Sequence, residues 1–302
     1  MSLALLIGGQ GTQHAEMLPW LDSCPEAAPV LGLIAARLGA DWRARLSDTD
    51  WSQGNAVAQP LLTGLSIAAW QGLASQLGRP AVVAGYSVGE LAAFCIAGAF
   101  GAEEAMTLAV ERAAAMDRST AGQATGLLHV QGLDSAKMAA ACERYGVSLA
   151  IRMAADRVVL GGTTKALLVA QQELSAAGAD CTRLPVRVAS HTPWMAQAAT
   201  EFEARLDAIA MAAPLSLLVC NHTGTAERDP DRLKQALARQ IASPVLWDSC
   251  MDAVAERRVR CVLEVGAGHA LAKLWRQRHP EIPVRSVDDF RSAQAVVRWV
   301  RG

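Results

Sequence analysis

The sequence predicts an α/β fold in which a mostly parallel sheet is covered by helices and a small domain is inserted into the chain. Short β-rich runs alternate with longer helical runs in both outer parts of the sequence. Between them, the elements expected over residues 126–187 follow the order βαββαβ, which is the ferredoxin-like unit. We therefore expect a large domain formed by residues 1–125 and 188–302, and an inserted domain formed by residues 126–187.

Glycine and proline divide the first part of the large domain into separate elements. A Gly-rich turn at residues 8–13 follows the first apolar run, and Gly78 and Pro80 end the first long helix. The elements expected here are a strand at 3–7, a helix at 60–77, a strand at 81–84, a helix that begins near Glu90 and a helix at about 102–117.

The inserted domain and the rest of the chain follow from the same changes of periodicity. In the insertion we expect strands at 127–132, 147–153, 157–160 and 181–186, with helices at 135–145 and 164–177. Beyond it we expect strands at 215–220 and 260–265, with helices at 231–241, 246–257, 270–278 and 290–300. The return of the strand and helix alternation makes an insertion the economical interpretation.

The composition of the chain excludes several classes of protein. Its 302 residues are enough to bury a sizeable core, and 52% hydrophobic against 19% charged residues exclude a disordered chain. With 28 Lys+Arg against 29 Asp+Glu, the surface carries no basic field for nucleic acid. The sequence has no signal-peptide pattern and no apolar run of ~20 residues, so we expect a cytoplasmic protein with no membrane partner.

Cysteine and histidine are scattered through the sequence. The seven cysteines form no C-x-x-C pair, which is typical of free thiols in a reducing compartment. The six histidines form no H-E-x-x-H or H-x-x-x-H pair, the spacing that a zinc site on a helix requires. We therefore expect no metal site.

A nucleophile is indicated at Ser87. The segment Gly85-Tyr-Ser-Val-Gly89 matches G-x-S-x-G, and it lies between an apolar strand and a helical pattern. In that context the serine lies on a sharp strand-to-helix turn, where N–H groups at the helix end favour a developing oxyanion. The alternative is an ordinary helix N-cap flanked by glycines.

A serine nucleophile needs a base, and two histidines are candidates. His191 follows the inserted domain, where a loop can face the cleft between domains. His269 follows the expected strand at 260–265, where an α/β-hydrolase carries its histidine. Spacing alone leaves both open.

Several further motifs follow one another along the chain. They are Gly9-Gln-Gly-Thr-Gln13, Gly85-Tyr-Ser-Val-Gly-Glu90, Glu111-Arg112 with Met116, Ser190-His191, Cys220-Asn-His222, Arg239-Gln240 followed by Ser243-Pro-Val-Leu-Trp247, and Glu264-Val-Gly-Ala-Gly268. With this ordered set, the sequence resembles the malonyl-CoA:acyl-carrier-protein transacylase family over essentially its whole length. The resemblance implies an α/β-hydrolase-like domain with a ferredoxin-like insertion.

The resemblance also implies the principal site residues. Ser87 would accept the acyl group, and His191 would be the general base that later becomes a general acid. Arg112 would hold the free carboxylate of a malonyl group, since a guanidinium can satisfy both carboxylate oxygens. The alternative for Arg112 is an exposed position on a helix surface.

Further positions match the family's site. The backbone N–H groups of Gln10 and Val88 would form the oxyanion hole, although polar residues are also common in Gly-rich turns for their own sake. Met116, Asn221 and Gln240 match positions at the substrate site, and a backbone carbonyl near Gln240 would orient the histidine.

Two residues depart from the usual family pattern. Tyr86 stands where histidine is common, and Gly9 stands where proline is common. These departures are similar to the malonyl-transferase subunit of biotin-independent malonate decarboxylase, which we favour over a transacylase of fatty-acid or polyketide synthesis.

The function expected from the resemblance is ping-pong transfer of malonyl from malonyl-CoA to an acyl carrier protein through malonyl-Ser87. The coenzyme A thioester is then a substrate, and no cofactor is permanently bound. One alternative is a serine esterase or thioesterase that uses His269 with Asp207 or Asp248. Another is a non-catalytic subunit that docks a carrier protein.

Overall fold

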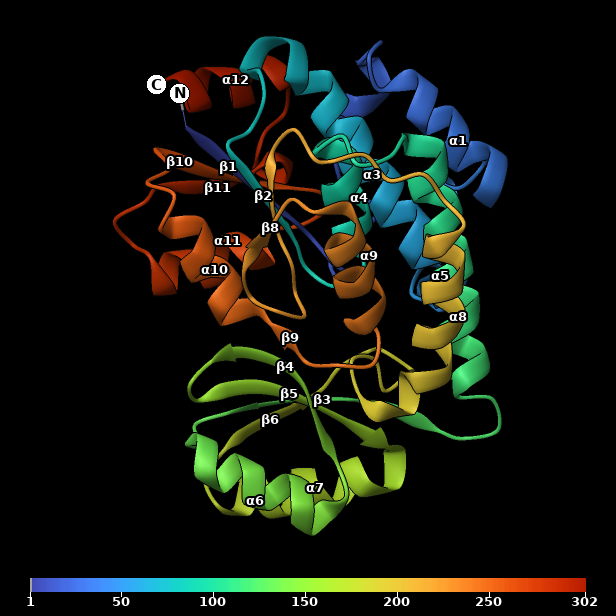
Figure 1. Ribbon diagram of the computed structural model, residues 1–302, viewed down its shortest axis with the longest axis vertical. Coiled ribbons are helices and arrows are strands. Elements are labelled where there is room, and N and C mark those ends of the chain that lie inside the picture. Colours follow the sequence, from blue (N-terminus) through green and yellow to red (C-terminus); the bar gives the residue numbers. More distant parts are fainter. Residues whose placement is uncertain (1) are drawn as a thin grey trace.

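The computed structural model describes residues 2–302 and contains a large and a small sheet, which lie at opposite ends of the molecule (Figure 1). The large sheet has the strand order β11-β10-β1-β2-β7-β8. Its strands are β1 (Leu3–Ile7), β2 (Val82–Gly85), β7 (Leu217–Val219), β8 (Ala226–Glu227), β10 (Cys261–Val265) and β11 (Val284–Ser286). All pairings are parallel except β7 with β8, so the expected parallel sheet is in fact mixed. The reason is a tight turn after β7, in which the N–H of Gly224 donates to the carbonyl of Cys220.

Strand β1 is the centre of the large sheet, and all five of its residues are buried. Ile7 pairs in register with Val265 of β10 and with Gly85 of β2. The carboxyl ends of these three parallel strands therefore meet at one edge of the sheet. Ligand sites of parallel sheets form at this edge, because the loops after the strands converge there.

Helices cover both faces of the large sheet (Figure 1). They are α1 (Ala28–Leu38), α2 (Thr49–Ser52), α3 (Asn55–Leu77), α4 (Gly89–Ile96), α5 (Ala102–Ser119), α8 (Ala196–Asp207), α9 (Pro230–Arg239), α10 (Trp247–Ala255), α11 (Ala270–Arg278) and α12 (Ala293–Arg301). Four 3-10 turns accompany them at Pro19–Ser23, Ala44–Ser47, Pro193–Met195 and Val287–Asp289. Helix α3 begins five residues earlier than expected, so Pro60 lies inside it, and α1 and α8 were not expected.

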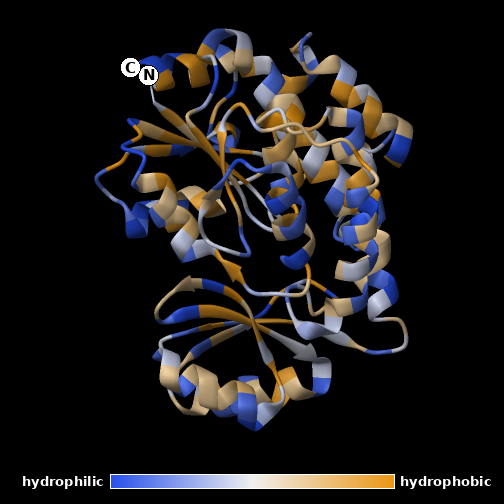
Figure 2. Cartoon of the chain, viewed as in Figure 1, coloured by the Kyte–Doolittle hydropathy of each residue, from blue (hydrophilic) through white to orange (hydrophobic). Residues whose placement is uncertain are grey.

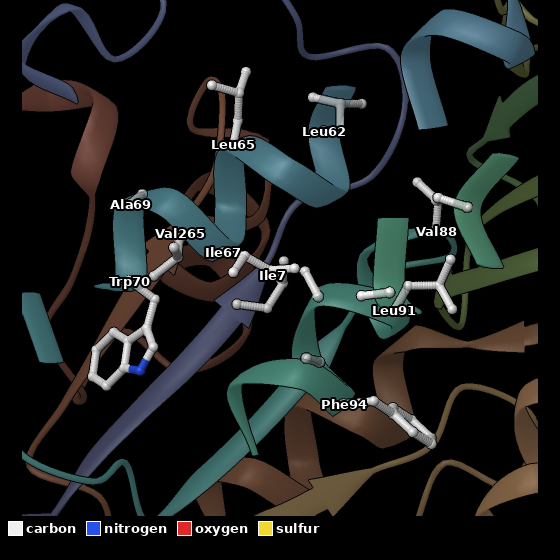
Figure 3. Close-up of a cluster of buried hydrophobic side chains, with 14 of the residues drawn as sticks. Ile7, Leu62, Leu65, Ile67, Ala69, Trp70, Val88, Leu91, Phe94 and Val265 are labelled. Carbon is white, nitrogen blue, oxygen red and sulfur yellow. The ribbon is translucent and has the colours of Figure 1, made fainter. Parts of the chain in front are cut away.

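The alternation of side chains along β1 divides the core in two. Leu5 and Ile7 belong to a cluster with α3, α4 and α5, whereas Ala4 and Leu6 belong to a cluster with α10 and α11. Figure 3 shows the first cluster, in which Ile7 lies among side chains of α3 and α4. The strands are accordingly among the most hydrophobic segments in Figure 2.

The small sheet contains the expected βαββαβ order. Its elements are β3 (Thr125–Gln131), α6 (Ser135–Tyr145), β4 (Ser148–Ala154), β5 (Arg157–Thr163), α7 (Thr164–Ala176) and β6 (Asp180–Arg183). The strand order is β6-β3-β5-β4-β9, and α6 and α7 cover one face (Figure 1). The fifth strand, β9 (Val245–Leu246), comes from outside residues 126–187 and pairs in parallel with β4.

A second contact, beside β9, joins the small sheet to α10, a helix that packs on the large sheet. Arg152 of β4 donates from Nε to Asp248 of α10 at 2.7 Å and from Nη2 to Ser249 at 3.0 Å. The small sheet is therefore attached through backbone pairing as well as side chains. Among residues 2–302, no helix combines the length and apolar character that crossing a membrane requires.

Replacing Gly89 with alanine should destabilise the fold, because the added β-carbon would lie 2.5 Å from the carbonyl oxygen of Ile7. We expect a loss of about 1–3 kcal/mol in the free energy of unfolding. The matched control is Gly32→Ala, on an exposed part of α1 where nothing lies within 4 Å. That change should stabilise by about 0.5–1 kcal/mol, since alanine is the better helix former. The free energy of unfolding is measured by chemical denaturation. Equal changes in the two variants would contradict the close approach of Gly89 to the Ile7 carbonyl.

Candidate active site

Ser87 lies in the turn between β2 and α4, and its backbone has a left-handed φ of 55°. That conformation is costly for a residue with a β-carbon and persists only when the surroundings impose it. Here the tight packing of the turn imposes it, and Gly85 and Gly89 permit that packing, because β-carbons there would lie 2.2 Å from the Glu90 nitrogen and 2.5 Å from the Ile7 oxygen, respectively. The turn therefore holds the Ser87 hydroxyl out from the end of the strand.

His191 contacts the Ser87 hydroxyl. Its Nε2 lies 2.7 Å from Ser87 Oγ, and its Nδ1 lies 2.6 Å from the backbone oxygen of Gln240. Because a carbonyl only accepts, Nδ1 must be the protonated nitrogen of the neutral ring, which leaves the Nε2 lone pair facing Ser87. The His191 N–H also donates to the Ile241 carbonyl at 2.9 Å. This geometry suits proton removal from Ser87.

The surroundings keep His191 neutral. Its side chain is 1% exposed, and burial lowers its pKa to about 3, helped by the nearby positive charge of Arg112 and opposed by the hydrogen bond to Gln240. A base with a lowered pKa stays unprotonated in mildly acidic solution. The ring is therefore ready to accept a proton over a wide pH range.

Arg112 is a buried cation beside the hydroxyl. It is 1% exposed, so the alternative of an exposed helix position is excluded. Its Nη1 donates to Gln59 Oε1 at 2.7 Å, while its Nη2 makes only long contacts of 3.5 Å to Ser87 Oγ and Gln240 Oε1. Burial lowers its pKa to about 10, although the nearby Glu90 opposes the shift. No carboxylate of residues 2–302 forms a salt bridge with it, so the pocket can accept an anionic group.

Asn221 supports the Ser87 turn from behind. Its Oδ1 accepts the Ser87 N–H at 2.8 Å, and its Nδ2 donates to the Gly85 carbonyl at 2.5 Å. Its own N–H donates at 2.7 Å to Glu90, a buried carboxyl whose pKa burial raises to about 8. Asn221 is therefore committed to the backbone of the turn, and the Ser87 N–H is not free to bind a substrate.

Two other backbone N–H groups at this edge are free. Within residues 2–302, neither the Gln10 N–H nor the Val88 N–H donates to a protein acceptor. The turn that carries Gln10 packs directly on the Ser87 turn, since a β-carbon on Gly9 would lie 2.7 Å from the Tyr86 carbonyl oxygen. The Gln10 side chain points elsewhere and donates to the Gln53 carbonyl at 3.0 Å. Free N–H groups so close to a nucleophile can stabilise an oxyanion.

A cavity of about 70 Å³ lies in front of Ser87. Its walls come from both sheets and include Gln10, Ser87, Arg112, Met116 and His191. Three predicted residues do not line it: Asn221 holds the Ser87 turn, Gln240 contacts His191 and Arg112, and the Val88 side chain packs in the hydrophobic core. Within residues 2–302, no group of His, Cys, Asp and Glu side chains is arranged to hold a metal ion.

His269 and its partners do not belong to this cavity. The His269 side chain is 68% exposed and lies 3.8 Å from Asp289, while Asp248 binds Arg152. The alternative in which His269 is the base is therefore wrong for this structure. The reason is that β10 ends in a turn that leaves its histidine in solvent, whereas the chain after β6 turns inward at His191.

One functional residue was missed. Gln59 of α3 holds Arg112 through Oε1, and its Nε2 contacts the sulfur of Met116 at 3.6 Å. The available signal was an amide side chain in the stretch 55–77, which contains no charged residue and is mostly apolar.

The chain is similar to known acyl transferases over nearly its whole length. The chain belongs to the acyl transferase domain family, whose model matches residues 6–302. Within that family, the malonyl CoA-acyl carrier protein transacylase of Mycobacterium tuberculosis is 33% identical over 296 residues, covering 94% of this chain and 96% of that protein.

Solved structures of transacylases have a similar fold over nearly the whole chain. The acyl-carrier-protein S-malonyltransferase of Burkholderia pseudomallei has a TM-score of 0.91 at 28% identity, covering 99% of this chain and 100% of that one. A malonyl-transacylase in complex with a type II PKS acyl-carrier protein has a TM-score of 0.92 at 26% identity, covering 99% of each chain.

The neutral state of His191 can be tested through the reactivity of Ser87. We expect the rate of Ser87 modification by phenylmethylsulfonyl fluoride to stay nearly constant from pH 7 to pH 5, because the pKa of about 3 keeps the base unprotonated. An ordinary histidine would lose reactivity about tenfold per pH unit below its pKa of about 6.5. Such a loss would show that His191 is not buried as described, and reagent hydrolysis at each pH is the control.

Proposed function

We propose that this protein transfers a malonyl group from malonyl-CoA to the thiol of an acyl carrier protein through a malonyl-Ser87 intermediate. The observation that carries the proposal is the buried guanidinium of Arg112, which has no carboxylate partner and lies 3.5 Å from the Ser87 hydroxyl. A buried cation is costly unless it is paired, so its position favours a substrate with its own carboxylate.

The first half-reaction follows from the contacts around Ser87. Oγ attacks the thioester carbonyl while His191 Nε2 takes its proton, and the oxyanion accepts hydrogen bonds from the N–H groups of Gln10 and Val88. The carbon–sulfur bond then breaks, and His191 returns the proton to the coenzyme A sulfur. In the second half, His191 takes the proton of the carrier thiol and the sulfur attacks the malonyl ester. The bond between the acyl carbon and Ser87 Oγ then breaks, and His191 returns the proton to Oγ.

The free carboxylate of malonyl would bind Arg112. Its Nη2 makes only long contacts and its Nε has no hydrogen-bond partner within residues 2–302, so donors remain for carboxylate oxygens. Met116 and Gln59 would line this end of the cavity, and Gln240 would hold both His191 and Arg112.

For the pathway, we propose fatty-acid or polyketide synthesis. The relatives are named as acyl carrier protein transacylases, and one structural neighbour is bound to a type II PKS carrier, which favours this alternative. The malonate decarboxylase subunit favoured by the sequence analysis depends on Tyr86 and Gly9 alone and has no support among these relatives. In the structure these two residues form one contact, with Tyr86 packed on Gly9.

We further propose the division made from the sequence. Residues 1–125 and 188–302 would form the α/β-hydrolase-like catalytic domain, and residues 126–187 the ferredoxin-like inserted domain. The coenzyme A thioester would be the substrate, with no permanently bound cofactor. A cytoplasmic location stays a prediction.

Mixing the protein with malonyl-CoA should add the mass of one malonyl group to the intact chain. We expect this gain to vanish in Ser87→Ala, because no other group is placed to accept the acyl. Intact-protein mass spectrometry measures it, and adding carrier protein bearing its thiol should remove the label. A non-catalytic docking subunit would gain no mass, and an esterase would lose the label to water without any carrier.

Arg112→Ala should separate malonyl transfer from simpler acyl chemistry. We expect kcat/KM for malonyl-CoA to fall on the order of 100-fold, since a charge-assisted contact with the carboxylate is lost. Transfer from acetyl-CoA, which has no such carboxylate, should fall much less. Arg112→Lys keeps the charge but lacks the planar guanidinium, so its kcat/KM for malonyl-CoA should lie between those of the unmodified protein and Arg112→Ala. Equal losses with both substrates would contradict a carboxylate-binding Arg112.

A further inference from the structure

We propose that a surface pocket between the β7–β8 hairpin and α9 binds a ligand that carries a phosphate or diphosphate group. We call it the α9 pocket, and in Figure 1 it lies where β8 and α9 adjoin. It measures about 360 Å³, and its walls include His222, Thr223, Glu227, Arg232, Gln235 and Arg239. The inference goes beyond the proposed function and does not depend on it.

The α9 pocket is separate from the catalytic cavity. Within residues 2–302, no residue lines both spaces. Asn221 and Gln240, which hold Ser87 and His191, are fully buried and line neither of them. The ligand of the α9 pocket is therefore not the acyl group that reaches Ser87.

One face of α9 supplies the positive charge. Arg232, Gln235, Ala236 and Arg239 stand at positions i, i+3, i+4 and i+7, which share one side of a helix. Within residues 2–302, no hydrogen bond or ion pair occupies the Arg239 guanidinium. The Arg232 side chain is 76% exposed, and its Nη1 has only a 3.7 Å contact with Glu227. Two guanidinium groups with unused N–H donors are suited to a phosphate.

The hairpin adds neutral donors. His222 Nδ1 is buried and has no hydrogen-bond partner within residues 2–302. Burial lowers the pKa of His222, and the positive charge of Arg239 lowers it further, so the ring is neutral and carries one N–H donor. The Thr223 hydroxyl accepts from the Thr225 N–H at 3.3 Å and from the Thr225 hydroxyl at 3.0 Å, so its own proton is available. Such donors can complete the hydrogen bonds of a phosphate oxygen.

One carboxylate opposes an anion in the α9 pocket. Among the described residues that line it, Glu227 alone is acidic. Its Oε1 accepts the N–H groups of Arg228 and Asp229 at 2.7 and 3.0 Å, which fixes it in the hairpin, and its Oε2 makes the long contact with Arg232. Two arginines against one carboxylate leave a net positive charge, which a phosphate would neutralise.

Pyrophosphate is the probe, and calorimetric titration of the full chain measures its Kd. We expect a Kd on the order of 1 mM, with a rise of about tenfold in Arg239→Ala because a charge-assisted contact is lost. Arg239→Lys should retain part of the affinity. Glu227→Gln should lower the Kd about two- to threefold, since it removes the competing charge and keeps an oxygen for the two N–H groups. The matched control, Arg298→Ala at an exposed position on α12, should leave the Kd unchanged.

A second measurement locates the ligand. In protein labelled with 15N histidine, the ring signals of His222 should shift on addition of pyrophosphate, while those of His191 should not. The His222 signals are assigned as those that disappear in His222→Gln. Saturating coenzyme A, which carries a diphosphate of its own, should not displace pyrophosphate.

Several outcomes would overturn the inference. These are no binding at about tenfold the expected Kd, and equal Kd values in Arg239→Ala and Arg298→Ala. A shift of His191 in place of His222 would locate the anion in the catalytic cavity, and displacement by coenzyme A would assign it to the substrate. The substituted residues are exposed or half-buried, so we expect the variants to fold. Because no readout requires malonylation of Ser87, failure of the proposed function would leave these results unchanged.

Discussion

The close packing of backbone around Ser87 is the constraint on which the site depends. The left-handed turn exists only because Gly85 and Gly89 leave room for neighbouring backbone atoms on either side. Gly9 brings the turn that carries Gln10 against the same place. Three glycines, one in the turn after β1, one at the end of β2 and one at the start of α4, thus set both the position of the hydroxyl and the position of the free N–H groups.

The electrostatics of the cavity follow from the burial of Arg112 and His191 without a carboxylate partner. Arg112 keeps its charge among neutral acceptors of Gln59 and Gln240, while His191 is held neutral by the same burial. The positive charge next to the ring further disfavours its protonation. A substrate anion that neutralises Arg112 would remove part of that effect, so substrate binding and the basicity of His191 are linked.

Much of the fold and site follows from local patterns. The strand, the glycines and the helix around Ser87 are contiguous in the sequence, so the turn could be predicted. Spacing alone could not decide between His191 and His269, because the decision depends on a contact with Gln240 that is far away along the chain; only the family resemblance indicated His191. Strand β9 could not be predicted because its two residues are too few to show a periodicity. The contact of Gln59 with Arg112 could not be predicted because it exists only when α3 and α5 pack together.

The pairing of β9 with β4 ties the small sheet to the geometry of the base. The chain reaches β9 a few residues after Gln240, whose carbonyl fixes the His191 ring, and His191 itself lies on the segment that leaves β6. The donor and the acceptor of that hydrogen bond are thus each connected along the chain to a strand of the small sheet. The orientation of the imidazole therefore depends on how the small sheet is attached, as well as on the turn that carries Ser87.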